Sequence, residues 1–249
     1  MQIQLIRSAT LIVEMAGKRL LIDPWLAEKS KGRSYSGRAQ SPLVDLPLPV
    51  EEILQGVDAV LISHLHSDHF DDVAQRALPK DMPIFCHHRD ADAIRTIGFE
   101  AVREIGEGVA LGKLHIRTTE GQHGPPEVLE DMGEVCGFLL SSEGEPKLYW
   151  AGDTILCSAV EDVLMTERPD VVVVHGCGAL WDGKGPLVMD AEMVLGTAGL
   201  AGGAQVLVTH LDAVDHATVG RADFHRLATA GARGADRIVI PADGERLSF

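Results

Sequence analysis

The chain has 249 residues, of which 45% are hydrophobic and 24% are charged, so it is long enough to bury a sizeable core in one large domain or two small ones. Its formal net charge of -15 and its aromatic content of 4% argue against nucleic acid as a partner, because a nucleic-acid backbone requires a basic face and bases require stacking platforms. No apolar stretch approaches the roughly 20 residues that span a bilayer, and the start shows no signal-peptide core. We therefore expect a cytoplasmic protein with no membrane partner.

The first part of the chain predicts strands followed by a long loop. Apolar runs over residues 3–6, 9–15 and 18–23 have the length and composition of strands. A polar stretch rich in Ser, Gly, Arg and Pro then extends from Glu28 to Pro49. Because structureless loops of this length are usually functional or disordered, two interpretations are open: a flap beside a site, which we favour, and a surface insertion.

From residue 50 onwards helical and strand patterns alternate, and this alternation predicts the architecture. Helices are predicted over residues 50–57, 68–78, 90–98, 158–168, 190–200 and 217–231. Strands are predicted over residues 58–63, 82–87, 114–120, 134–142, 146–152, 169–176, 204–210 and 236–242. Each half of the chain has hairpin-like strands and then strand–helix alternation. That pattern predicts two β-sheets packed together with helices outside, in a single domain covering residues 1–249.

The stretch SHLHSDHF, residues 63–70, places three histidines and one aspartate directly after a predicted strand. His64 and His66 are separated by one residue, so an extended backbone points both imidazoles to the same side. Asp68 and His69 are expected in the first turn of the following helix, where the chain changes direction and a second pair of ligands can face a second ion. Imidazole and carboxylate ligands suit Zn²⁺, Fe²⁺ or Mn²⁺.

Further metal-capable side chains follow predicted strands elsewhere in the chain. They are His123 in EGQHG, Asp153 in WAGDT, His175 in VVVVHG and His210 in VTHLD. Strand ends deliver their residues to one edge of a sheet, and the neighbouring glycines allow close approach of the backbone. Convergence of these side chains on the SHLHSDHF motif predicts a metal site at that edge, whereas unrelated polar groups would leave the shared placement unexplained.

The strings LLIDPWL, SHLHSDHFDD, WAGDT, VTHLDAVDH and IPADGE resemble those of metallo-β-lactamase-fold hydrolases, in the branch related to ascorbate-phosphate lactonases. They cover nearly the whole chain. The resemblance implies an α/β (α+β) fold, a four-layer αββα sandwich in which two mixed sheets pack face to face with helices outside. It also implies two divalent metal ions at one edge of the sheets, with Zn²⁺ as the first candidate and Mn²⁺ or Fe²⁺ as alternatives.

The resemblance implies a role for each metal-capable residue as well. His64, His66 and His123 would hold the first metal, and Asp68, His69 and His210 the second. Asp153 would bridge the two metals, and Asp68 and Asp153 would be the catalytic carboxylates. Asp23 in LLIDP matches an acidic residue beside the site, so we expect it to hydrogen-bond a ligand histidine. The alternative for Asp23 is a turn residue before Pro24.

For two further histidines the sequence allows several interpretations of their role. His175 stands where close relatives more often have Asn; it could contact substrate, replace a supporting amide, or be a buried hydrogen-bonded histidine. His216 in DAVDH could orient the loop that carries His210 or point to solvent. Trp25 and Trp181 lie next to site segments and are candidate apolar walls of a pocket.

A pair of bound divalent cations lowers the pKa of a shared water from near 16 towards about 7, so hydroxide is available without a side-chain base. The predicted function is therefore a metal-dependent hydrolase that cleaves a lactone, ester or related bond in a small metabolite, with an anionic substrate as one option. Three alternatives are open: a phosphodiesterase acting on a nucleotide or phospholipid-derived ester, a metal-binding sensor without turnover, and a diiron redox protein, for which H-x-E-x-D is expected instead of HLHSDH. A homo-oligomer is also compatible with a flap that folds against a neighbour.

Overall fold

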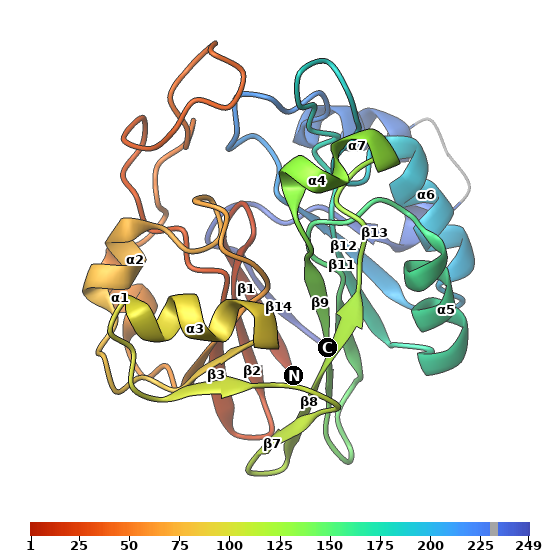
Figure 1. Ribbon diagram of the computed structural model, residues 1–249. Helices are drawn as coiled ribbons and strands as arrows, with labels where there is room; N and C mark the ends of the chain where they lie inside the picture. Colours follow the sequence, from red (N-terminus) through yellow and green to blue (C-terminus); the bar gives the residue numbers. More distant parts are fainter. Residues whose placement is uncertain (230–233) are drawn as a thin grey trace.

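In the computed structural model, which describes residues 1–229 and 234–249, two β-sheets pack against each other (Figure 1). Each sheet has seven strands within these residues. The first sheet has the order β14 (Arg246–Ser248), β1 (Gln2–Arg7), β2 (Thr10–Met15), β3 (Lys18–Ile22), β4 (Ala59–Ile62), β5 (Ile84–Cys86) and β6 (Val102–Glu104). The second has the order β13 (Ile238–Val239), β12 (Gln205–Thr209), β11 (Val171–His175), β10 (Leu148–Trp150), β9 (Cys136–Ser141), β8 (Leu114–Glu120) and β7 (Val109–Leu111).

Both sheets follow the same pattern of strand direction. In the first sheet, neighbouring strands from β14 to β3 pair antiparallel, and those from β3 to β6 pair parallel. In the second sheet, neighbouring strands from β7 to β10 pair antiparallel, and those from β10 to β13 pair parallel. The two halves of the chain therefore share one topology, as their sequence pattern indicated.

Helices cover the outer face of each sheet (Figure 1). The first sheet carries α1 (Val50–Leu54), α2 (Asp72–Ala77) and α3 (His88–Thr96), and the second carries α5 (Ser158–Glu167), α6 (Ala191–Leu200) and α7 (Arg221–Thr229). Three shorter segments are the 3₁₀ turns η1 (Pro126–Val128) and η2 (Ala235–Arg237) and the helix α4 (Leu129–Met132). No helix in the described parts of the chain is long and apolar enough to cross a membrane. The order helix, sheet, sheet, helix confirms the predicted αββα sandwich.

Three hydrophobic cores hold these layers together. In the core between the sheets, Val173 of β11 belongs to the same cluster as Phe85 of β5. The alternate residues Val172 and Val174 belong to the core between the second sheet and its helices, together with Val194 of α6. A third core lies between the first sheet and α1 to α3. Because β11 is buried on both faces, its sequence is a continuous apolar run, and each buried valine contributes roughly 1.5–3 kcal/mol.

Helix α2 begins later than the sequence pattern predicted. Asp68 and His69 were expected in its first turn, but both lie in a preceding turn, in which the amide of His69 donates to the carbonyl of His66 over 3.0 Å. Asp71 has an extended backbone and is the N-cap, and its side chain accepts a hydrogen bond from the amide three residues later. Because this carboxylate satisfies an otherwise free amide of the first turn, the helix starts directly after it.

Other differences concern a helix end and short edge strands. The helix predicted over 217–231 begins at Arg221, and residues 230 and 231 of that prediction lie outside the described residues. The strands β6, β7 and β14 and the segment 126–132 were not predicted. These three strands are short and partly exposed, so no run of alternating apolar residues marks them.

Candidate metal centre

Strand ends from both sheets meet at one edge of the sandwich, and the metal-capable side chains lie there. Asp23 follows β3 and the segment from His64 to His69 follows β4 in the first sheet; in the second sheet His123 follows β8, Asp153 follows β10, His175 ends β11 and His210 follows β12. Parallel strands present their carboxyl ends at the same edge, so segments far apart in the sequence become neighbours.

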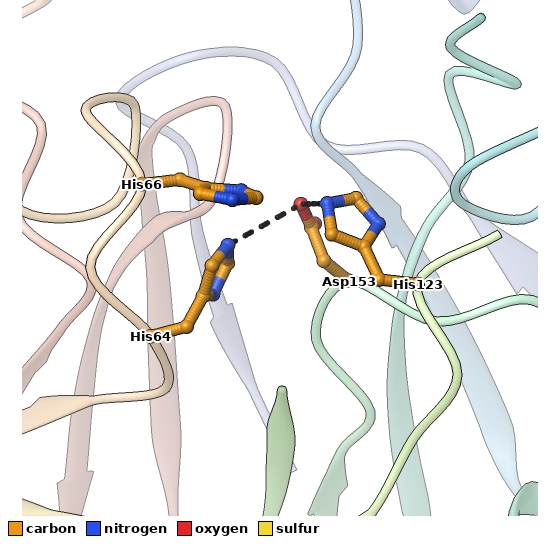
Figure 2. A group of neighbouring side chains, drawn as sticks. All are labelled: His64, His66, His123 and Asp153. Atoms are coloured by element: carbon orange, nitrogen blue, oxygen red, sulfur yellow. Dashed lines mark ion pairs between the residues drawn. The ribbon is translucent and has the colours of Figure 1, made fainter. Parts of the chain in front are cut away.

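The first group consists of His64, His66, His123 and Asp153, which Figure 2 shows pointing toward one another. One potential ligand atom from each of the four lies within 4.8 Å of the others. The Asp153 Oδ2 atom is 3.4 Å from His123 Nε2 and 3.9 Å from His64 Nε2. The structure thus brings the three histidines predicted for the first metal together around the predicted bridging carboxylate.

The second group consists of His69, Asp153, His175 and His210, whose potential ligand atoms also lie within 4.8 Å of one another. His69 Nε2 is 3.2 Å from Asp153 Oδ2, and His210 Nε2 is 4.0 Å from Asp153 Oδ1. His175 Nδ1 donates a hydrogen bond of 2.5 Å to Asp153 Oδ1. Asp153 is therefore common to both groups.

Several imidazole nitrogens at this edge are buried without a hydrogen-bond partner, namely the Nε2 atoms of His64, His69, His175 and His210. A buried polar atom without a partner costs about 1–3 kcal/mol, and a bound cation would remove that cost. The donor set of imidazoles and one carboxylate is the one that Zn²⁺, Fe²⁺ and Mn²⁺ accept. The residues present therefore fit the metal that the sequence resemblance implies.

Asp23 orients two of the histidines, His69 directly and His64 through Ser63. Its Oδ2 atom accepts hydrogen bonds of 2.6 Å from His69 Nδ1 and from the Ser63 hydroxyl, and its Oδ1 atom accepts from the Ser63 amide over 2.8 Å. Since the Ser63 hydroxyl proton goes to Asp23, its oxygen is the acceptor for His64 Nδ1, at 2.9 Å. Both rings are thereby fixed with Nδ1 as the hydrogen-bond donor, which leaves Nε2 as the atom available to a cation. This contact matches the one expected for Asp23.

The charge state of the histidines differs with their surroundings. Burial lowers the pKa of His123 and of His175 to about 4, so both rings are neutral at pH 7, the state that metal binding requires. Burial would also lower the pKa of His69, but the carboxylates of Asp153 and Asp23 outweigh it and raise that pKa to about 10. Despite burial, Cys177, Asp153 and Asp68 likewise raise the pKa of His210. His69 and His210 are therefore the rings whose extra proton a bound cation would displace.

Asp68 and His216 lie at the same edge but make different contacts. Asp68 Oδ2 is 3.5 Å from His210 Nε2, so the carboxylate is next to a predicted ligand of the second metal. The His216 ring is buried and lies 4.8 Å from the ring of Tyr35, centroid to centroid. His216 therefore faces the site rather than solvent, and the part of its prediction that placed it in solvent is wrong.

A cavity of about 180 Å³ opens onto the two groups. It is lined by Arg33, Tyr35, His66, Ser67, Asp68, His123, Asp131, Met132, Asp153, Ala179, Trp181, Leu187, Val188, His210 and His216. Trp181 is a wall of this cavity, as expected, whereas Trp25 is 2% exposed and lies in the hydrophobic core instead. His175 is fully buried against Asp153 and is absent from the lining, so the structure places it as a buried hydrogen-bonded histidine.

The long polar stretch between Glu28 and Pro49 lies beside this cavity, as predicted, because it contributes Arg33 and Tyr35 to the lining. Sequence reasoning singled out neither residue, nor Ser63, nor Asp215. The motif DAVDH did draw attention to His216, and Asp215 is its neighbour. No spacing rule marks Arg33 or Tyr35, and Ser63 contacts Asp23 from a segment 40 positions away as well as its neighbour His64.

A known protein family and a curated relative match this chain. The family described as the beta-lactamase superfamily domain matches residues 18–211. The UPF0173 protein YddR of Bacillus subtilis (strain 168) is 36% identical to the chain, over 100% of both sequences.

Two solved structures are similar over the whole chain. A crystal structure of an isothiocyanate hydrolase from Delia radicum gut bacteria has a TM-score of 0.95 and 36% sequence identity, and the match covers 100% of this chain and 99% of that chain. A crystal structure of a possible metal-dependent hydrolase from Veillonella parvula DSM 2008 has a TM-score of 0.96 and 30% identity, with the same coverage of each chain. The narrower resemblance to ascorbate-phosphate lactonases stays a prediction. The chain belongs to the beta-lactamase superfamily and is a metal-dependent hydrolase with the metallo-β-lactamase fold.

Proposed function

We propose that the chain hydrolyses a small substrate at a centre that holds two divalent cations, with Zn²⁺ as the first candidate and Mn²⁺ or Fe²⁺ as alternatives. The observation that carries this proposal is the Asp153 carboxylate. Its Oδ2 atom lies within 4.0 Å of His64, His69 and His123, and its Oδ1 atom lies within that distance of His175 and His210. A carboxylate that belongs to both groups of histidines suits a bridge between two ions.

The residues divide into two ligand sets in this proposal. His64, His66 and His123 would hold the first cation, His69 and His210 would hold the second together with Asp68, and Asp153 would serve both. When bound, the two cations lower the pKa of a water molecule and polarise the bond under attack. Burial alone would raise the pKa of Asp68, but His210 and His69 hold it below its ordinary value. Asp68 is therefore a weak proton acceptor and acts mainly through its negative charge.

Two substrate classes are supported, each by a different observation. The predicted class, lactones and esters, follows from the reaction that such a centre performs on a carbonyl carbon. Isothiocyanates are the second class, because a protein of that activity is 36% identical over the whole chain. Addition of water across R–N=C=S gives the thiocarbamic acid R–NH–C(O)–SH, which releases an amine and carbonyl sulfide. The apolar walls Met132, Trp181, Leu187 and Val188 suit the organic group of either class.

Phosphodiesters are less well supported by the cavity. Arg33 is the only lysine or arginine among the described residues that line it, and its side chain is exposed. The two cations would meet the single charge of a phosphodiester at the reacting group, but the described lining offers only this exposed guanidinium for any further phosphate. We therefore expect neutral or singly charged substrates with an electrophilic carbon.

The proposal predicts metal stoichiometry and substrate class together. Protein purified with added Zn²⁺ or Mn²⁺ should contain close to two ions per chain, and removal by a chelator should abolish turnover and lower the melting temperature, since a ligand that binds only the folded state stabilises it. Activity should be found on lactones, aryl esters or isothiocyanates, and should return when the metal is restored. A chain that holds no metal under these conditions, or that cleaves only phosphodiesters, would contradict the proposal.

A variant of His175 tests whether His175 or Asp68 is a ligand of the second cation. His175 Nδ1 donates to Asp153, so in this proposal the histidine orients the bridge, and metal binding through its partnerless Nε2 atom is the alternative that the variant tests. His175→Asn keeps an N–H donor and should retain two ions per chain, with turnover within about tenfold of the parent, whereas His175→Ala should lose about 10–100-fold. Loss of one metal equivalent from His175→Asn, measured by elemental analysis, would make His175 a ligand in place of Asp68.

A further inference from the structure

The loop over residues 28–43, which we call the flap, has no helix or strand but is fixed at its base. The side chain of Arg7 is fully buried and lies under both ends of the flap. Its guanidinium donates to the carbonyls of Trp25 and Ala27, each over 2.9 Å, and to the carbonyl of Val44 over 3.2 Å. A single buried side chain therefore holds the entry and the exit of the flap together.

The tip of the flap is fixed by the carboxylate of Asp215, which lies in the loop after β12. The hydroxyls of Ser34 and Ser36 donate to Asp215 Oδ2 over 2.6 and 2.8 Å, and the amide of Tyr35 donates to Oδ1 over 2.8 Å. Weaker bonds come from the amides of Ser36, Arg38 and Ala39, between 3.2 and 3.3 Å. Both carboxylate oxygens accept hydrogen bonds from the tip of the flap. Bonds to a negatively charged acceptor are stronger than bonds to a neutral one.

This anchoring sets the position of Tyr35 at the cavity. The Tyr35 ring packs on His216, the residue after Asp215, and its hydroxyl lies 2.8 Å from the hydroxyl of Ser67. Ser67 is exposed and stands between His66 and Asp68 in the metal-binding motif. The Tyr35 hydroxyl is thus part of the cavity wall directly beside the predicted metal ligands, in contact with a hydroxyl that solvent or substrate can reach.

We propose that Tyr35 contacts the substrate through its hydroxyl and that Asp215 is the positioning residue that holds Tyr35 over the metal centre. The proposal rests on the hydrolytic function proposed above. The hydroxyl donates a hydrogen bond to a heteroatom of the substrate, in exchange for its bond with Ser67, and no proton is transferred. Asp215 does not meet the substrate; it acts by fixing the backbone on either side of Tyr35.

The chemistry of Asp215 explains why a carboxylate is needed at this position. An asparagine has one acceptor and one donor group, so its NH₂ would face amide N–H groups or hydroxyls of the flap that now donate to Asp215. Asp215→Asn keeps the volume of the side chain but leaves part of the flap tip without an acceptor. The variant therefore loosens the flap without removing a ligand of the metal centre.

The test is a double-mutant cycle on a substrate that the parent hydrolyses. Tyr35→Phe should lower kcat/KM by about tenfold, the effect of one lost hydrogen bond in the reaction. Asp215→Asn should lower it by about tenfold or more, and the double variant should be no worse than Asp215→Asn, because Tyr35 is already displaced. A double variant with the product of the two losses, about 100-fold, would mean that Asp215 does not act through Tyr35. An unchanged kcat/KM in Tyr35→Phe would overturn the substrate contact.

A second readout needs no substrate. Trypsin cleavage within the flap, after Lys29, Lys31, Arg33 or Arg38, should be at least about fivefold faster in Asp215→Asn than in the parent, because cleavage follows local opening. Tyr35→Phe and the control Asp92→Asn, an exposed change on α3, should be cleaved at the parental rate. All variants should keep the parental metal content. Equal flap cleavage in Asp215→Asn and the parent would refute the positioning role, whereas a parent without hydrolytic activity would refute the proposed function and the role of Tyr35 with it.

Discussion

Replacing Asp153 by alanine should abolish turnover, with a loss in kcat/KM of about 10³-fold or more, and should reduce the metal content of the chain. The carboxylate stands between two sets of histidines, and no other described residue belongs to both four-residue groups. Without it, His69 loses the neighbour at 3.2 Å, and the two sets share no anion. Both metal retention and the reactivity of water at the centre depend on that shared charge.

Asparagine at the same position removes the negative charge of the side chain but keeps its shape. Asp153→Asn can still accept the hydrogen bond from His175, but its uncharged amide is a poor bridge between two cations. We expect its turnover to fall nearly as far as that of the alanine variant, and we expect at least one metal equivalent to be lost. The matched control is His115→Ala, an exposed histidine on β8, which should keep parental metal content and kcat/KM. Two retained metals with near-parental turnover in Asp153→Ala would remove the bridging role.

The convergence of the site could be predicted because it follows from strand direction. The histidines of SHLHSDHF, Asp153 and His210 each come directly after a buried apolar strand, and parallel strands present their carboxyl ends at one edge. The turn before Asp153 also carries its own signal. Gly152 has a φ of 73°, and a Cβ there would lie 2.6 Å from the Trp150 ring, so only glycine fits this turn.

Other parts of the site could not be predicted, because they depend on contacts between distant segments. The bond between Ser34 and Asp215 joins residues that are 181 positions apart, and nothing in the spacing of either segment indicates the other. The same holds for His175, whose bond to Asp153 connects two neighbouring strands of one sheet. For helix α2 the sequence pattern predicted too long a helix. Its apolar pattern extends back to Asp68, but the local capping bond of Asp71 decides where the helix begins.

Replacing Asp23 by asparagine should weaken metal binding by about 10–100-fold while leaving the fold intact. Asp23 has a φ of 46°, a left-handed conformation that asparagine tolerates well, so the substitution adds little backbone strain. If the asparagine oxygen accepts from the Ser63 amide, its NH₂ must face His69 Nδ1. That contact moves the ring proton of His69 to Nε2, the atom that faces Asp153, and removes the lone pair a cation needs.

Alanine at this position tests the structural part of the same argument. Asp23→Ala leaves the Ser63 amide, the Ser63 hydroxyl and His69 Nδ1 buried without their acceptor, so the free energy of unfolding should fall by about 3 kcal/mol or more. Denaturant unfolding of the metal-free proteins measures this loss, and competition with a chelator measures the affinity loss in Asp23→Asn. Asp92→Asn should change neither quantity. If Asp23→Asn bound metal as tightly as the parent, the hydrogen bond from His69 to Asp23 would not set the ring tautomer, and His69 would be oriented by packing alone.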